Sequence, residues 1–165
     1  MKMIQKMRNA RENKKGFTLT EMIVVLVIIV ILIALLVPTL VGYIDKAKEK
    51  SVMAEGKRVL DATQTIVSEA YGLDSTLPGL TKNTAFYVTG QSSYSAETAT
   101  DNIGLRVARL SELKNNVTVK ITINTENKVS ELIINDGGKA AKYDGTKWTL
   151  GKDTDTGMSA TNPNP

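Results

Sequence analysis

Residues 14–38 read KKGFTLTEMIVVLVIIVILIALLVP, a basic pair followed by a short polar stretch and then a long apolar run. Every residue from Met22 to Val37 is apolar, and apolar residues continue with few interruptions to Ile44. At about 1.5 Å per residue, a helix over 22–44 is roughly 34 Å long, enough to cross a hydrocarbon layer of about 30 Å. The run therefore predicts a membrane-spanning helix.

One acidic residue, Glu21, stands at the start of this run. A carboxylate inside a membrane segment is costly unless a partner compensates its charge, so an intramembrane acid points to function. We interpret Glu21 as a residue kept for a partner. An ordinary secretory signal peptide is disfavoured, because the run is longer than such peptides need and ends without an Ala-x-Ala cleavage site.

The charge of the chain is concentrated at its N-terminus. The net charge is +4, yet residues 1–16 carry six basic residues and one acidic residue, which leaves 15 basic and 16 acidic residues elsewhere. The positive-inside rule therefore puts the N-terminus of a single-pass precursor in the cytoplasm. The nearly neutral remainder gives no reason to expect nucleic-acid binding by an isolated subunit.

The composition argues against catalysis. The chain has no Cys and no His, which excludes disulfides, thiolate sites, Ser-His nucleophiles and most zinc sites. Carboxylate or lysine chemistry stays open, but we predict no enzyme and no cofactor. The segment Asp153–Gly157 is similar to the start of an EF-hand loop, but it lacks the bidentate Glu such a loop requires, so we interpret it as part of a solvated tail without a metal.

The helix is expected to continue beyond the membrane. Apolar residues recur on one face, at Ile44, Ala47, Val52, Val59, Ala62, Ile66, Val67 and Ala70. We predict one helix over 17–71, with Gly72 as its C-cap and a bend at Pro38 and Gly42. The charged residues between the apolar ones, Asp45, Lys46, Lys48, Glu49, Lys50, Glu55, Lys57 and Arg58, are interpreted as a solvated face with i,i+4 pairs, or as contacts between subunits.

The rest of the chain changes period. Residues 73–116 read as a connection with a short strand over 85–88 and a helix over 103–113, capped by Asp101 or Asn102. Alternating residues then predict an antiparallel meander within 117–150, with strands over 117–123, 128–134, 139–143 and 147–150. The fold class is α+β, with the amphipathic half of the helix, 45–72, on the apolar face of the meander. Tyr143 and Trp148 are expected in the core, and the tail 151–165 is expected to be poorly ordered.

The segment Lys14–Glu21, followed directly by the apolar run, resembles the class III signal sequence of type IV pilins and pseudopilins. The resemblance implies a leader over 1–16, cleavage between Gly16 and Phe17 by a prepilin peptidase, and N-methylation of Phe17. It also implies that 17–44 forms the membrane segment and later the core of a fibre, where Glu21 serves subunit assembly.

By the same resemblance we expect a homo-oligomeric extracellular pilus for adhesion, surface motility or aggregation, assembled by a platform and its ATPase. The absence of Cys makes a Gram-positive, clostridial-type major pilin plausible, because many pilins of two-membrane bacteria carry a disulfide. A pseudopilin of a secretion or DNA-uptake system is the nearest alternative. A singly anchored receptor or enzyme domain is a more distant one.

Overall fold

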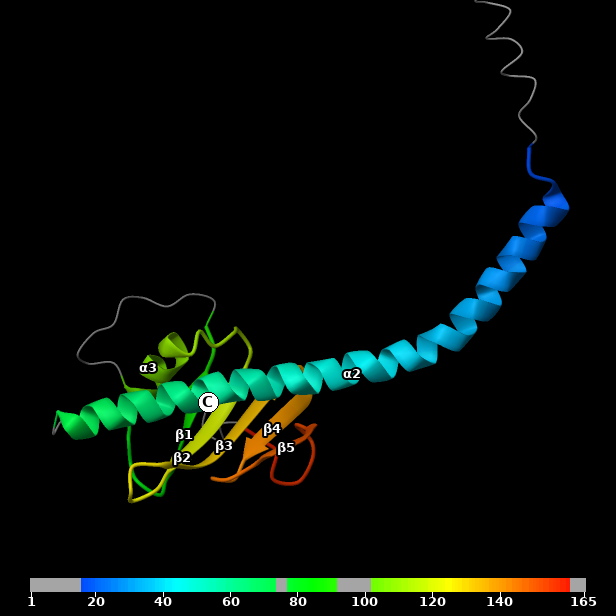
Figure 1. Cartoon of the computed structure of the whole chain (residues 1–165). Coiled ribbons are helices and arrows are strands. Elements are labelled where there is room, and N and C mark those ends of the chain that lie inside the picture. Colours follow the sequence, from blue (N-terminus) through cyan, green and yellow to red (C-terminus); the bar gives the residue numbers. More distant parts are fainter. Residues whose placement is uncertain (1–15, 74–76, 92–101, 161–165) are drawn as a thin grey trace, which may run out of the picture. The chain divides into compact units, whose positions relative to one another are not determined.

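The computed structural model describes residues 16–73, 77–91 and 102–160 (Figure 1). The chain divides into two units, which meet in sequence between Ile44 and Asp45. The first unit contains the apolar half of helix α2 (Leu19–Gly72), and the second contains the remaining helix with a five-stranded sheet. The α+β, pilin-like fold class is thereby confirmed.

Helix α2 runs for 54 residues, close to the predicted bounds. The expected C-cap at Gly72 is wrong in detail, because Gly72 is the last helical residue and is not among the residues with positive φ. The Leu73 N–H donates to Glu69 O at 3.0 Å and extends the last turn by one bond. The predicted packing face is corrected at its start, since Ile44 and Ala47 are exposed and burial begins at Val52.

The sheet is an antiparallel meander in sequence order, formed by β1 (Ala85–Thr89), β2 (Thr118–Ile123), β3 (Val129–Asp136), β4 (Lys139–Tyr143) and β5 (Trp148–Lys152). The short strand expected in the connection is β1, which pairs with β2 and makes five strands where the C-terminal pattern predicted four. Gly137 (φ 56°) and Gly138 (φ 81°) close the β3–β4 hairpin, which needs left-handed backbone at both positions.

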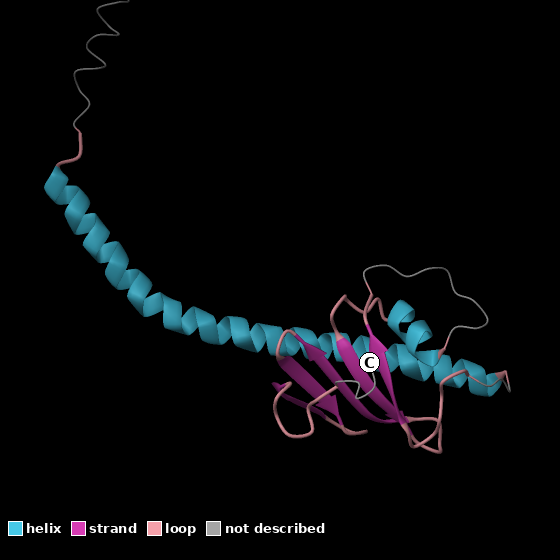
Figure 2. Ribbon diagram, turned by 180° about the vertical axis from the view of Figure 1, so that it is seen from behind, coloured by secondary structure: helices cyan, strands magenta, loops and turns pink. Residues whose placement is uncertain are grey.

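The main core lies between the second half of α2 and one face of the sheet (Figure 2). Val119, Ile121 and Ile123 alternate with half-buried polar residues along β2, and Leu132 and Ile134 face the same way on β3. Tyr143 and Trp148 pack against this core as predicted, with ring centroids 5.4 Å apart.

The opposite face of the sheet has its own cover, which corrects the expectation of a poorly ordered tail. Gly151 belongs to β5, and Met158 and Ala160 are 7% and 1% exposed. The Asn135 side-chain amide can donate to the Met158 carbonyl at 2.9 Å. Residues 153–160 therefore pack on the sheet because two apolar side chains among polar ones find buried positions there; 161–165 lie outside the described residues.

Helix α3 (Ile103–Leu110) is three residues shorter than predicted. Asn102 is its cap and accepts a hydrogen bond from the Leu105 N–H at 2.9 Å, while Asp101 lies outside the described residues. Leu113, expected on the helix, follows it and is still buried. The Leu113 N–H donates to Ala108 O at 3.0 Å. This hydrogen bond holds the turn after the helix against its last residues, and the Leu113 side chain stays in the core.

Candidate assembly site at the start of the long helix

The first turn of α2 is closed by Thr18 and Glu21. The Glu21 N–H donates to Thr18 Oγ1 at 3.2 Å, and Glu21 Oε2 accepts from the Thr18 N–H and from the Thr18 hydroxyl, both at 2.8 Å. This is a capping box, in which a Thr and a Glu three residues later each satisfy a backbone N–H that has no partner in the helix. Glu21 therefore has a partner within its own chain.

Sequence reasoning interpreted Glu21 only as a charge awaiting a partner and missed this contact. The signal was available, because Thr18-Leu19-Thr20-Glu21 has the T-x-x-E spacing that marks a helix start. Two hydrogen bonds from Thr18 satisfy the carboxylate oxygen, but Thr18 is neutral and leaves the negative charge of Glu21 uncompensated.

The residues before this turn are open to solvent. Phe17 is 78% exposed and Leu19 is 76% exposed, and a Cβ added to Gly16 would meet no atom within 4 Å. Gly16 and Phe17 precede the helix and have no regular secondary structure. The Gly16–Phe17 bond is thus accessible within the part of the chain that the structure describes.

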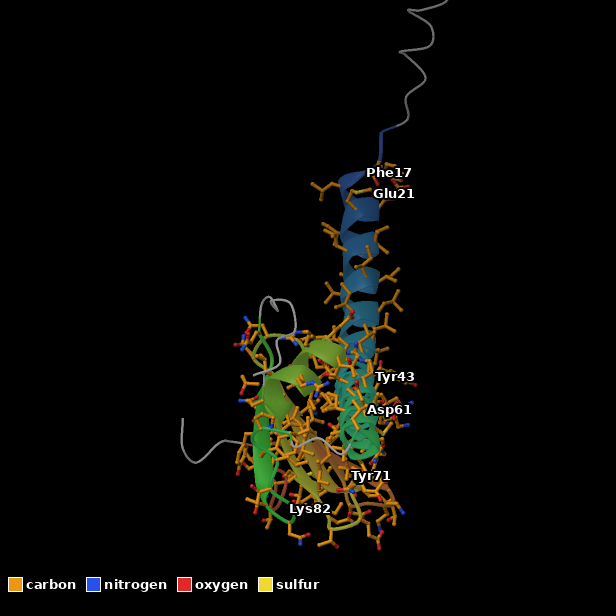
Figure 3. All side chains as sticks on the ribbon, turned by 90° about the vertical axis from the view of Figure 1, so that its left-hand side faces the viewer. Phe17, Glu21, Tyr43, Asp61, Tyr71 and Lys82 are labelled. Atoms are coloured by element: carbon orange, nitrogen blue, oxygen red, sulfur yellow. The ribbon has the colours of Figure 1, made fainter. Side chains whose placement is uncertain are left out.

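The apolar half of α2 has no cover within the described part of the chain. From Met22 to Ile44 every large hydrophobic side chain is at least 42% exposed. Figure 3 shows Phe17 and Glu21 at the beginning of this helix, with side chains projecting from it on all sides. Among the described residues, α2 is the one helix long and apolar enough to cross a membrane. A surface of this kind requires lipid or other apolar helices around it.

Pro38 and Gly42 lie inside the continuous helix. Pro38 lacks an N–H and so cannot donate to the carbonyl of Ala34. Nearby, the Thr39 hydroxyl donates to Leu36 O at 2.7 Å. A Cβ on Gly42 would meet no atom within 4 Å, so packing inside the subunit does not require glycine there. The bend at these residues stays a prediction.

The charged residues of α2 are exposed as predicted, except for the half-buried Glu49 and the buried Glu55. Glu55 is buried, with its carboxylate 3.0 Å from Lys114 Nζ and 3.3 Å from the Lys114 backbone nitrogen. A buried carboxylate needs charged or hydrogen-bonding partners. The shorter contacts come from Lys114 in the segment after α3, and Arg58 on the same helix adds a longer ion pair at 3.9 Å. Helical spacing anticipates a pair with Arg58 but gives no sign of the contact with Lys114, which lies 59 residues away.

In the EF-hand-like segment, Asp155 has a local structural role. The Asp155 carboxylate accepts from the Lys152 N–H at 2.8 Å and closes the turn after β5. Within the described ranges, no group of three or more potential acidic, His or Cys ligands is positioned to hold a metal ion.

Comparison with known families gives one match. Residues 11–37 match the family model described as the prokaryotic N-terminal methylation motif. No curated protein and no solved structure shows significant similarity to the chain. The motif, which contains Gly16, Phe17 and Glu21, defines a class III signal peptide. Together with the long helix and its antiparallel sheet, it makes this chain a type IV pilin-like protein.

Proposed function

We propose that the chain is a structural subunit of an extracellular type IV pilus, which serves adhesion, surface motility or aggregation. The observation that carries the proposal is the methylation motif at the start of a helix whose apolar half is uncovered among the described residues. Such a helix suits a membrane before assembly and a bundle of identical helices afterwards. The partners are further copies of the chain, a prepilin peptidase, and an assembly platform with its ATPase.

Processing is proposed at the Gly16–Phe17 bond, followed by N-methylation of Phe17. Cleavage would remove the leader with its six basic residues and one acidic residue, and so the charge that would resist extraction of the helix from the membrane. It would also create an ammonium group on Phe17, four positions before Glu21. The exposure of Phe17 and the open surroundings of Gly16 support access by a peptidase.

Glu21 is proposed to pair with the new Phe17 amine of a neighbouring subunit in the fibre. The capping box supplies hydrogen bonds but no positive charge, so a Glu21 carboxylate buried among apolar helices still needs a cation. Removing one partner of a buried ion pair typically costs about 3–5 kcal/mol. That is enough to set the register between helices whose other contacts are apolar and interchangeable.

Two matched variants separate assembly from helix capping. Glu21→Gln keeps the T-x-x-E/Q capping pattern and removes the charge, whereas Thr18→Ala removes the hydroxyl and keeps the charge. We expect Glu21→Gln to be cleaved normally but to form few fibres, and Thr18→Ala to assemble close to the parent level. Normal fibre formation by Glu21→Gln together with loss of fibres in Thr18→Ala would show that capping alone is the role of Glu21.

Mass spectrometry of fibres sheared from cells tests the function itself. Abundant shed subunits that begin at N-methyl-Phe17 are expected for a pilin. Processed subunits that remain bound to cells would instead identify a pseudopilin of a secretion or DNA-uptake system. An uncut chain that begins at Met1 would identify a singly anchored receptor or enzyme domain and refute processing.

A further inference from the structure

Three lysines directly follow the apolar segment on α2, namely Lys46, Lys48 and Lys50. All three are exposed, and in sequence they alternate with Asp45 and Glu49, which suggested mutual neutralisation on the helix. The structure assigns these two acids to a different partner. Lys139 of β4 lies 3.6 Å from Asp45 Oδ1 and 3.1 Å from Glu49 Oε1.

This arrangement leaves the three helix lysines without a counter-charge from the part of the chain that the structure describes. The Lys139 side chain is only 15% exposed and holds the two acids against the sheet. Its hydrogen bond to Glu49 raises the pKa of Lys139, so Lys139 stays charged at any physiological pH. Within the described ranges, no acidic side chain comes within ion-pair distance of Lys46, Lys48 or Lys50.

The exposed lysines also repel one another. Lys46 and Lys50 are four residues apart on one helix, where like charges are mutually destabilising. The four lysines and two acids of this group carry a net charge of +2. An external anion at this position would relieve the repulsion.

The position of the lysines along the helix indicates which anion this is. At about 1.5 Å per residue, Lys46 lies roughly 3 Å beyond Ile44, and Lys50 roughly 9 Å beyond it. A headgroup layer is about 5–8 Å thick on each side of the hydrocarbon, and helical side chains lean toward the N-terminus of their helix. The lysine side chains therefore lean toward the membrane, and long cationic side chains readily reach its interface.

Tyr43 adds an independent observation. It is 72% exposed at the end of the apolar segment, and Tyr is enriched where a membrane helix leaves the hydrocarbon. Tyr43 precedes, by a few positions in the sequence, the three lysines that form no ion pair with an acidic residue in the described part of the chain. This combination is typical of a helix end located among lipid headgroups rather than in bulk water.

We propose that Lys46, Lys48 and Lys50 bind the phosphate groups of anionic lipids on the outer side of the membrane and hold the subunit there before assembly. The proposal deepens the proposed function, because it rests on the membrane-anchored form of the chain. It does not depend on cleavage or on fibres. The charge of the bound lipid, rather than the apolar segment alone, then contributes to retention of the subunit.

Lipid selectivity in reconstituted vesicles tests this site. The full chain is placed in phosphatidylcholine vesicles with trace spin-labelled phosphatidylglycerol or spin-labelled phosphatidylcholine, and the motionally restricted fraction of each label gives their relative association. The basic residues within 1–16 also attract anionic lipid, but they contribute equally to every variant compared.

The test variant is Lys46→Gln/Lys48→Gln/Lys50→Gln, and the control is Lys57→Gln/Lys82→Gln/Lys147→Gln, which removes the same charge from exposed positions. Lys57 is an especially close match, because it lies on the same helix but roughly 20 Å beyond Ile44. We expect the test variant to lose at least about twofold in selectivity for phosphatidylglycerol, since each basic residue near an anionic surface contributes about fivefold. The control variant should match the parent, and added salt should abolish the difference.

Three results would overturn the proposal. Selectivity could be unchanged in the test variant, or it could fall equally in the control variant, which would indicate net charge alone. The third is unchanged selectivity with loss of fibres in the test variant but not in the control variant, which would assign the three helix lysines to contacts between copies of the chain. If lipid selectivity is unchanged but fibres form, the lipid proposal is wrong and the proposed pilin function is unaffected. If the chain is not cleaved, the proposed pilin function is wrong, but the lipid selectivity of the full chain can still be measured and interpreted.

Discussion

Gly56 of α2 and Trp148 of β5 should be strongly coupled in the stability of the second unit. A Cβ added to Gly56 would lie 2.7 Å from Trp148 Cη2, 2.8 Å from Trp148 Cζ3 and 3.0 Å from Ile134 Cγ2. Real side chains almost never come this close, so Gly56→Ala forces the indole ring to move. The helix approaches the sheet closely at this point because Gly56 has no side chain.

Two opposing terms set the size of the effect. Overpacking in a core costs about 1–3 kcal/mol, whereas replacing Gly by Ala inside a helix gains about 1 kcal/mol. In the parent background we therefore expect Gly56→Ala to destabilise by about 0–2 kcal/mol. In a Trp148→Leu background the ring is absent, and the same substitution should stabilise by up to about 1 kcal/mol. The propensity term cancels in the cycle, which leaves a coupling energy of about 1–3 kcal/mol.

Hydrogen exchange of the β2 and β3 amides, measured by mass spectrometry on the full chain in detergent micelles, reports the relevant free energy. Fluorescence is unsuitable because Trp148 is the single Trp of the chain. Gly72→Ala is the control, since its added Cβ meets no atom within 4 Å, and its effect should be the same in the parent and in the Trp148→Leu background. Equal effects of Gly56→Ala in both backgrounds would refute the close-packing argument.

Two further substitutions test the polar contacts of the same unit. Glu55→Ala should lower the free energy of unfolding by about 2–3 kcal/mol, because a charged hydrogen bond is lost, while Lys114 is 56% exposed and can be rehydrated. Glu55→Gln keeps an acceptor for the Lys114 N–H and should cost about half as much in denaturant unfolding; equal losses would show that the charge rather than the acceptor matters. Hydrogen bonds from the Lys147 N–H and from Thr146 lower the pKa of Asp144 from 3.8 to about 2. Because the folded pKa is the lower one, Asp144 stabilises the β4–β5 turn above about pH 4, and this contribution disappears as the pH falls toward 2. Asp144→Asn should therefore flatten the loss of turn protection between about pH 4 and 2 in hydrogen exchange, and an unchanged acid limb in the variant would contradict this role.

Much of the candidate site was predictable because it is local in sequence. Gly16, Phe17 and Glu21 lie within six positions of one another, and the apolar run needs only its composition to predict a long exposed helix. The capping box was readable too, since Thr18 and Glu21 are separated by one helical turn. The local sequence could not indicate whether an acidic residue of α2 forms an ion pair with a neighbour on the helix or with a lysine on a strand, as Glu49 does with Lys139.

The elements were predicted to within a few residues where periodicity is strong. Strand β4 was predicted with its observed ends, whereas α3 was predicted too long because Leu113 continues the apolar spacing after the helix has ended. The tail was misjudged for a related reason. Met158 and Ala160 are isolated among polar residues, and only the sheet offers them a place to be buried.

The sequence by itself determined the two halves of α2, the antiparallel meander and the methylation motif, because each depends on residues close together along the chain. The tertiary structure decided which charged residues of α2 form ion pairs and which do not. Asp45 and Glu49 bind Lys139, and Glu55 binds Lys114, across separations that helical spacing cannot anticipate. Charge balance in a folded chain depends on distance in space. For that reason a stretch that is nearly neutral in sequence presents, beside the membrane segment, lysines that no described acid neutralises.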